Sequence, residues 1–231
     1  MGAVKGGRGL LALAVAAGAI YALTMGTRQS HALFISAINS STGVGYAAIS
    51  LAFGVQQLMW GVAQPVAGAL SDRWGLRRVM IGGAILFACA TALIPLATNA
   101  WSLILVLGIL FAAGAGSGGP AQLAAAVSRW IPETKRSVAN GIINAGGSFG
   151  QFTLVPLAQL FIGIAGWQPA LVILGALGLL TIPLLLYVTA LPPAVSAASM
   201  QAGTLGQAVR GAFRDRSYLL LTAASSPAAS T

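Results

Sequence analysis

The stretch "GALSDRWGLRR", residues 68–78, joins two long apolar runs and decides how the chain is organised. Gly75 gives the backbone the freedom that a tight turn requires, and Asp72 stands just before the next apolar run. The arginines that follow are suited to contact lipid headgroups. An ordinary basic loop would not need the spacing G-x-x-x-D-R-x-G-x-R-R, so the stretch predicts a short, specific turn between two membrane spans.

The composition around this turn is that of a membrane protein. Of 231 residues, 57% are hydrophobic and 6% are charged, and the mean hydropathy is +0.87. Soluble domains carry about 25% charged residues, so this chain has too few charged side chains to coat a surface that faces water. The net charge of +9 is compatible with nucleic-acid binding. However, the cations stand in small clusters between apolar runs, which is typical of membrane topology.

The sequence contains no pattern for catalysis or metal binding. Cys89 is the single cysteine, which excludes an internal disulfide, and we interpret it as a packing residue. No nucleophile-and-base set, metal-ligand spacing or phosphate loop is present. We therefore expect no enzyme, no cofactor and no bound metal. The basic start and apolar centre of residues 1–19 resemble a signal peptide, but more apolar runs follow, so we interpret this region as a first span that acts as its own targeting signal.

Six apolar runs meet the length of about 20 residues that a membrane span needs. They cover approximately residues 10–38, 46–70, 79–98, 102–128, 138–165 and 169–191. The sequence thus predicts an all-α membrane protein whose residues 10–191 form a six-helix transmembrane bundle, after an N-terminal segment of residues 1–9.

Two further segments follow the bundle. Residues 192–217 form a linker in which Leu205, Val209 and Phe213 recur at helical spacing, which predicts a short amphipathic helix on the membrane surface. Residues 218–231 begin like a seventh span and stop after a few apolar residues.

The distribution of positive charge predicts the orientation in the membrane. Eleven of the twelve Lys and Arg residues fall in segments 1–9, 71–78, 129–137 and 192–217. The alternating connections near 39–45, 99–101 and 166–168 contain no charged residue. Because short basic loops stay in the cytoplasm, we expect both termini to be cytoplasmic in a multi-pass protein of the plasma or inner membrane.

With these spans in place, the spacing of residues 68–78 resembles the loop between the second and third helices of the major facilitator superfamily. "RWIPETKRSVANGIINAGGSFGQF", residues 129–152, is similar to that family's loop between helices 4 and 5 and its glycine-rich fifth helix. Within the superfamily, "GTRQSHALF", "QQLMWGVAQPVAGALSDRWG" and "AGGSFGQFTLVPLAQ" look most like the monocarboxylate porter group, which includes bacterial oxalate:formate antiporter-like proteins. The resemblance covers residue 10 to about residue 221, the first half of that fold.

The resemblance implies two six-helix bundles that move by alternating access around a central site. It also implies a cytoplasmic latch between the bundles, made of Gly68, Asp72, Arg73, Gly75, Arg77 and Arg78. This sequence contains one bundle, and the partner expected for Asp72 would lie in the other.

We therefore expect a truncated N-terminal half of a secondary transporter of small mono- or dicarboxylates, inactive alone. A half-size transporter that works as a homodimer, and a membrane scaffold that transports nothing, are the alternatives. Substrate identity, coupling ion and direction of transport stay open.

Polar residues within the apolar runs indicate which helices face the interior. The runs at 79–98 and 169–191 carry almost no strongly polar group, whereas the other four carry several. Since polar groups in hydrocarbon turn toward protein or a wet cavity, we expect the third and sixth spans to lie outermost. The candidate substrate-binding residues are Arg28, His31, Gln57, Trp60, Gln122 and Asn144.

Arg28 is the strongest of these candidates. An arginine at the centre of a span costs about 2.5–3.5 kcal/mol on insertion scales. It could snorkel to the interface if the first span ended before it, but the apolar run continues beyond His31 to residue 38. We therefore expect Arg28 to face inward, where its planar fork of donors matches a carboxylate.

The remaining candidates keep two interpretations. His31 is either a site residue or a hydrogen-bonded packing residue. Gln57, Trp60 and Gln64 share a helix face and either line the cavity or form interhelical hydrogen bonds. The chain's three acidic residues all fall in connections, so we expect anion binding without cation coupling in this half unless His31 titrates.

Overall fold

The computed structural model describes residues 7–189, and these residues form helices joined by short turns. The predicted linker helix in 192–217 and the predicted start of a seventh span in 218–231 lie outside the described residues, as do residues 1–6.

Six helical segments are long and apolar enough to cross a membrane, which confirms the predicted bundle. The first three spans consist of α1 (Gly7–Ser30), the 3-10 helix η1 (His31–Phe34) and α2 (Ile35–Thr42); α3 (Tyr46–Trp74); and α4 (Leu76–Leu93) with η2 (Ile94–Leu96). The last three consist of α5 (Ala100–Leu103), the π-helix η3 (Ile104–Phe111), α6 (Ala112–Ser117) and α7 (Pro120–Ser128); α8 (Glu133–Ala165); and α9 (Trp167–Leu179) with α10 (Thr181–Thr189).

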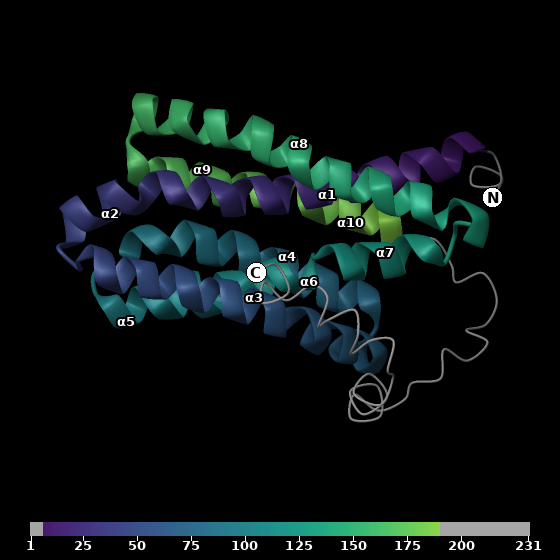
Figure 1. The fold of residues 1–231 in the computed structure, drawn as a ribbon, viewed down its shortest axis with the longest axis horizontal. Coiled ribbons are helices and arrows are strands. Elements are labelled where there is room, and N and C mark those ends of the chain that lie inside the picture. Colours follow the sequence, from purple (N-terminus) through teal and green to yellow (C-terminus); the bar gives the residue numbers. More distant parts are fainter. Residues whose placement is uncertain (1–6, 190–231) are drawn as a thin grey trace, which may run out of the picture. The chain divides into compact units, whose positions relative to one another are not determined.

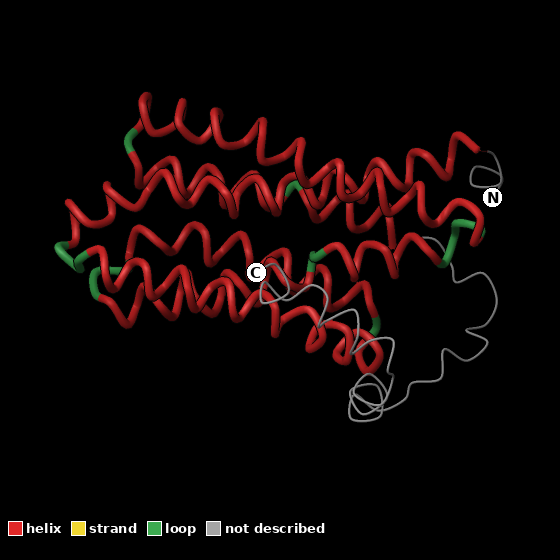
Figure 2. The backbone as a smooth tube through the Cα atoms, viewed as in Figure 1, coloured by secondary structure: helices red, strands yellow, loops and turns green. Residues whose placement is uncertain are grey.

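The connections between spans are tight and gather at two ends (Figure 2). The basic turns, at Gly75 and at residues 129–132, lie at one end, and the uncharged turns near Gly43, Asn99 and Gly166 lie at the other. Gly75 has a φ of +89°, and its N–H donates to the carbonyl of Ser71 at 3.0 Å. Because that φ strongly favours glycine, Gly75 is the residue that allows α3 to turn directly into α4. The placement of the basic end in the cytoplasm stays a prediction.

Helices pair closely within the bundle (Figure 1). α1 packs along α8, α3 packs against α6 and η3, and α4 packs against α9. Glycines permit the first of these contacts: a Cβ atom on Gly18 would lie 3.1 Å from the carbonyl oxygen of Ile142. Small residues at such positions let helix backbones approach within a membrane, where dispersion packing and hydrogen bonds hold helices together.

The expectation that the third and sixth spans lie outermost does not hold for this bundle taken by itself. Half of the most apolar stretch of the first and fourth spans is buried, against 44% for the span that begins with α4 and 39% for the sixth. For α3 and α8 the buried share is only 22% and 17%. Polar side chains such as Gln57 on α3 and Asn144 on α8 are therefore exposed at a face of the bundle, whereas Gln56 of α3 is buried.

Three apolar clusters fill the bundle. One includes Met80 and lies toward the end with the basic turns, and a second includes Leu171 and lies toward the opposite end. Between them the rings of Phe87 and Phe111 pack with their centroids 5.1 Å apart. This packing fixes α4 against the π-helical part of the fourth span. Phe111 also contacts His31, three residues after Arg28.

Candidate functional site

The side chain of Arg28 joins α1 to α3. Its Cζ lies 4.5 Å from the centroid of the Trp60 ring, and its Nη2 donates a hydrogen bond to Oε1 of Gln57. Its Nη1 lies 3.9 Å from Sδ of Met25, a contact that the sequence did not indicate. The structure thus brings together Arg28, Gln57 and Trp60, three of the six candidates, although Arg28 lies 29 residues before Gln57 in the sequence.

The charge of Arg28 has no counter-ion among residues 7–189. The acidic residues in this range are Asp72 and Glu133, and the one salt bridge within it joins Glu133 to Arg136. Nε of Arg28 is buried and has no hydrogen-bond partner in the described part of the chain. The guanidinium therefore combines an uncompensated positive charge with an unused N–H group, which is the chemistry that a carboxylate or another oxyanion satisfies.

The helix around Arg28 ends in a local change of geometry. The hydroxyls of Thr24 and Ser30 bond to carbonyls four residues earlier, at 2.9 and 2.8 Å. Such bonds satisfy buried hydroxyls and often bend a helix. The α-helix ends at Ser30, and the 3-10 turn that begins at His31 continues the span. A mid-span 3-10 stretch of this kind often marks a hinge.

His31 lies deeper than Arg28 and contacts different residues. Its side chain is 2% exposed, its Nδ1 lies 3.4 Å from Nε2 of Gln56, and its ring centroid lies 4.4 Å from that of Phe111. Its Nε2 is buried without a hydrogen-bond partner in the described residues. These contacts are those of a packing residue, the second of the two interpretations made from the sequence. A substrate role for His31 stays a prediction.

Gln122 and Asn144 lie apart from this group. Gln122 is 6% exposed, and its Nε2 donates to the carbonyl oxygen of Gln64 at 3.3 Å, which links α7 to α3. Asn144 is exposed and donates to the carbonyl oxygen of Asn140, one turn earlier on α8, at 2.9 Å. Their predicted contact with substrate stays a prediction, and the observed bonds are local or structural.

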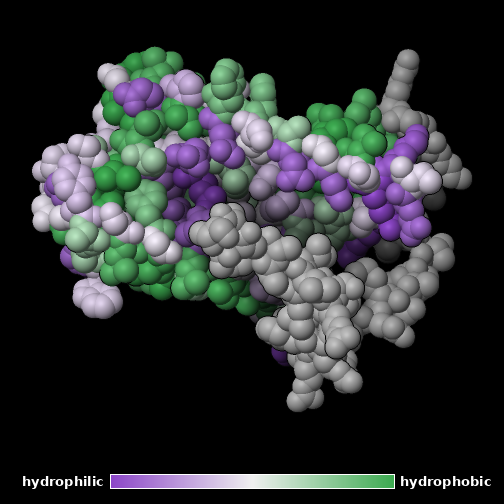
Figure 3. All heavy atoms as spheres, in the orientation of Figure 1, coloured by the Kyte–Doolittle hydropathy of each residue, from purple (hydrophilic) through white to green (hydrophobic). Residues whose placement is uncertain are grey.

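Polar residues on either side of Asn144 on α8 were not among the predicted site residues. Asn140 and Ser148 are exposed on either side of Asn144, and Gln151 is half-buried one turn further on. The spacing of three to four residues places these side chains on one face of the helix, and that spacing was the available signal. In Figure 3, hydrophilic side chains gather in the middle of the face on which α3 and α8 are seen, between apolar surfaces.

Five of the six predicted latch residues lie at the turn between α3 and α4, and Gly68 lies one turn before Asp72 within α3. Asp72, Arg73, Arg77 and Arg78 are exposed there. No salt bridge joins them to one another or to any other described residue. Asp72 therefore remains available for a partner, and its role as a latch stays a prediction.

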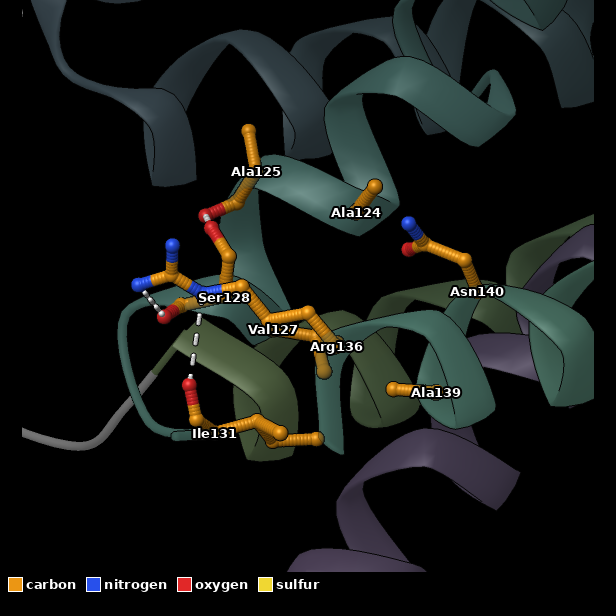
Figure 4. A pocket seen from close by; sticks show the side chains of 8 residues that line it. All are labelled: Ala124, Ala125, Val127, Ser128, Ile131, Arg136, Ala139 and Asn140. Atoms are coloured by element: carbon orange, nitrogen blue, oxygen red, sulfur yellow. Dashed lines mark hydrogen bonds between the residues drawn. The ribbon is translucent and has the colours of Figure 1, made fainter. Parts of the chain in front are cut away.

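A small pocket between α7 and α8 is lined by Arg136, whose guanidinium bonds to other residues of the chain (Figure 4). Arg136 donates from Nε to the carbonyl of Ile131 and from Nη2 to that of Ser128, both at 3.4 Å, and its Nη1 contacts Oε1 of Glu133. The pocket measures about 180 Å³, below the roughly 300–1,000 Å³ of ligand pockets. We interpret Arg136 as a structural residue that stabilises the turn at residues 129–132.

These observations define a multi-pass membrane protein whose bundle carries an uncompensated cation at an exposed polar face. The sequence profile of the Major Facilitator Superfamily matches residues 17–230, and the chain belongs to this superfamily. The family's members are transporters rather than enzymes.

Three curated relatives illustrate the match. The chain is 28% identical over 144 residues to a probable sulfoacetate transporter of Cupriavidus necator, covering 62% of this chain and 33% of that protein. It is 34% identical over 174 residues to human monocarboxylate transporter 11, covering 71% and 35%. It is 28% identical over 169 residues to the oxalate:formate antiporter of Oxalobacter formigenes, covering 72% and 39%. The chain spans about a third of the length of the curated relatives it matches.

Proposed function

We propose that this chain provides the N-terminal six-helix half of a secondary transporter for small organic anions of the mono- or dicarboxylate type. The observation that carries the proposal is the guanidinium of Arg28, which lies on the Trp60 ring without a counter-ion among the described residues. A positive charge in a membrane span is costly unless it is paired, so a bound anion would supply the missing partner.

The geometry indicates how a carboxylate would bind. Trp60 supports one face of the guanidinium, and Gln57 fixes one end of it. These contacts orient the planar fork and leave the Nε–H without a partner. A carboxylate in the plane of the guanidinium would accept charge-assisted hydrogen bonds from it, which are stronger than hydrogen bonds between neutral groups.

Transport by alternating access requires a second six-helix unit, either a C-terminal half or a second copy of this chain. The low burial of α3 and α8 supports such a partner, because their polar side chains would then line an interface or a wet cavity. In this arrangement Gly68, Asp72, Arg73, Gly75, Arg77 and Arg78 act as the latch on the cytoplasmic side, with Asp72 bonded to the second unit.

Within residues 7–189 no acidic side chain lies in the middle of a span, since Asp72 and Glu133 stand at helix ends. The bundle therefore supplies the charge that binds the anion and no carboxylate that would carry a proton or hold sodium. A coupling ion would be bound by the second unit, or His31 would have to titrate.

The test uses the chain in lipid nanodiscs and the fluorescence of Trp60. Because the guanidinium lies on this ring, an anion that binds Arg28 changes the indole's environment. We expect oxalate, formate or sulfoacetate to give a saturable change that chloride does not give. Trp60→Phe removes the change, Arg28→Gln abolishes it, and Arg28→Lys weakens it because an ammonium lacks the planar fork. The matched control, Arg129→Gln, titrates as the wild type.

A saturable change that survives in Arg28→Gln would overturn the assignment of the site. A wild-type chain that binds none of these anions, in the nanodisc and together with a second six-helix unit, would instead support the membrane scaffold.

A further inference from the structure

A groove on the opposite side of α3 from Gln57 has no role in the proposed anion site. It lies between α3 and α4, with one wall from α6, and measures about 470 Å³. Val62, Val66 and Leu70 of α3 line it, together with Leu86 of α4. At 100° per residue, Val62 and Val66 lie about 140° and 180° around the helix from Gln57. This α3–α4 groove therefore faces away from the polar side of α3.

Part of the wall that α4 contributes to the groove has no side chains. Gly82 and Gly83 both line it. Gly83 packs tightly on Ser117 of α6, whereas a Cβ atom on Gly82 would meet no atom within 4 Å. The space beside Gly82 is thus open, and its surroundings are hydrocarbon side chains.

The end of the groove near the α3–α4 turn is cationic and aromatic. Arg78 and Trp74 line this end, and Arg73 and Arg77 are exposed on the same turn. None of the three arginines forms a salt bridge with a described residue. Tryptophan is enriched where membrane meets water, and basic pockets between spans on the cytoplasmic side bind anionic headgroups.

We propose that the α3–α4 groove binds an anionic phospholipid, with one acyl chain beside Gly82 and the phosphate on Arg78. The volume lies within the roughly 300–1,000 Å³ of ligand pockets. The apolar walls match hydrocarbon, and the arginine at one end matches a phosphate, which guanidinium binds through paired hydrogen bonds. A lipid with no net charge would fill the same walls but would gain less from Arg78 and from the net positive charge of this turn, where three arginines outnumber Asp72.

The experiment measures which lipids stay bound after the purified chain is transferred from a mixture of phosphatidylglycerol and phosphatidylcholine into detergent. Native mass spectrometry counts the retained molecules of each. The wild type is expected to retain phosphatidylglycerol several-fold over phosphatidylcholine. Arg78→Gln loses this preference, and Arg78→Lys keeps part of it. Gly82→Leu fills the groove and loses both lipids.

Two matched controls separate the groove from general effects of charge and bulk. Arg129→Gln removes an exposed arginine at the other basic turn, and Gly141→Leu adds a side chain to α8 where a Cβ atom meets nothing within 4 Å. Both are expected to retain lipid as the wild type does. If Arg129→Gln reduces the preference as much as Arg78→Gln, or if Gly82→Leu retains as much lipid as Gly141→Leu, the proposed site is wrong.

A second measurement compares the two lipids in the wild type, so its main result does not depend on the folding of a variant. Phosphatidylglycerol with brominated acyl chains is expected to quench tryptophan fluorescence in the wild type more than brominated phosphatidylcholine does. Trp74→Phe, at the end of the groove, removes this difference. Equal quenching by the two lipids would contradict the selectivity for an anionic headgroup.

Discussion

A Cβ atom placed on Gly146 of α8 would lie 2.7 Å from the Cα of Gly18 on α1. The backbones of these helices are therefore in contact, and no side chain separates them. Gly150 repeats the arrangement one turn further on, where a Cβ atom would lie 2.5 Å from the carbonyl carbon of Ala22. The G-x-x-x-G spacing of Gly146 and Gly150 presents two small residues on one helix face, as in tightly packed membrane helices.

Replacing Gly146 by alanine should destabilise the bundle. The added methyl group meets backbone atoms, which cannot move aside as a flexible side chain can, so we expect a loss of about 1–3 kcal/mol, the range for overpacking. Gly141→Ala on the same helix is the control, since its Cβ atom meets nothing within 4 Å. That change should stabilise the helix by about 0.5–1 kcal/mol. Thermal unfolding in detergent, followed by circular dichroism, measures both, and equal melting temperatures would contradict the close contact.

The lengths of the apolar runs predicted the six spans, because a chain in lipid must satisfy its backbone hydrogen bonds internally and a long helix does so. Helical spacing predicted that Gln57 and Trp60 share one face of α3, because residues three apart in a helix lie on the same side. The structure confirms the six spanning helices and brings Arg28 to that face.

Other features depend on contacts that no local pattern encodes. The π-helix at Ile104–Phe111 and the 3-10 turn at His31–Phe34 occur in stretches without proline. They meet where His31 packs on Phe111, with the ring centroids 4.4 Å apart. Arg28 and His31 lie only three residues apart, yet His31 contacts Gln56 and Phe111 while Arg28 contacts Gln57 and Trp60.

The pair formed by His31 and Gln56 should show energetic coupling. Both side chains are at most 4% exposed, and each is the other's side-chain hydrogen-bond partner at 3.4 Å. His31→Leu leaves the Gln56 amide unpaired, and Gln56→Leu does the same to the imidazole, so each single change should destabilise. The double variant removes both polar groups and should lose less than the sum by about 0.6–1.7 kcal/mol. Additive melting shifts would show that the two groups do not interact.

Gly75 should be intolerant of any side chain although there is space for one. A Cβ atom at this position meets nothing within 4 Å, but the residue has a φ of +89° and a ψ of +135°. This backbone conformation is costly for other residues, so Gly75→Ala should lose about 1–3 kcal/mol of stability. Gly82→Ala, in regular helix and equally open space, should gain up to about 1 kcal/mol. Opposite signs for the two alanine variants are the expected result, and a stabilised Gly75→Ala would rule out backbone strain at the turn.

Arg136 should control the mobility of the turn at residues 129–132. Its guanidinium bonds to the carbonyls of Ser128 and Ile131, so Arg136→Gln removes two bonds that hold this turn to the start of α8. We expect backbone amides of the turn to exchange with deuterium about tenfold faster, for about 1.4 kcal/mol of lost hydrogen bonding. Lys135→Gln removes a neighbouring charge whose side chain makes no hydrogen bond or salt bridge to a described residue, and it should leave exchange unchanged. A similar acceleration in both variants would indicate an effect of net charge.

Gln57 distinguishes an anion site from an ordinary interhelical bond. In the proposed site it orients the guanidinium of Arg28, so Gln57→Leu should weaken carboxylate binding about fivefold, for about 1 kcal/mol of lost orientation. Stability should change little, because Gln57 is exposed and Trp60 still holds the guanidinium. The Trp60 fluorescence titration gives the affinity, and thermal unfolding of the same samples gives the stability. A fall in melting temperature with unchanged affinity would instead assign Gln57 to helix packing and leave Arg28 and Trp60 as the site.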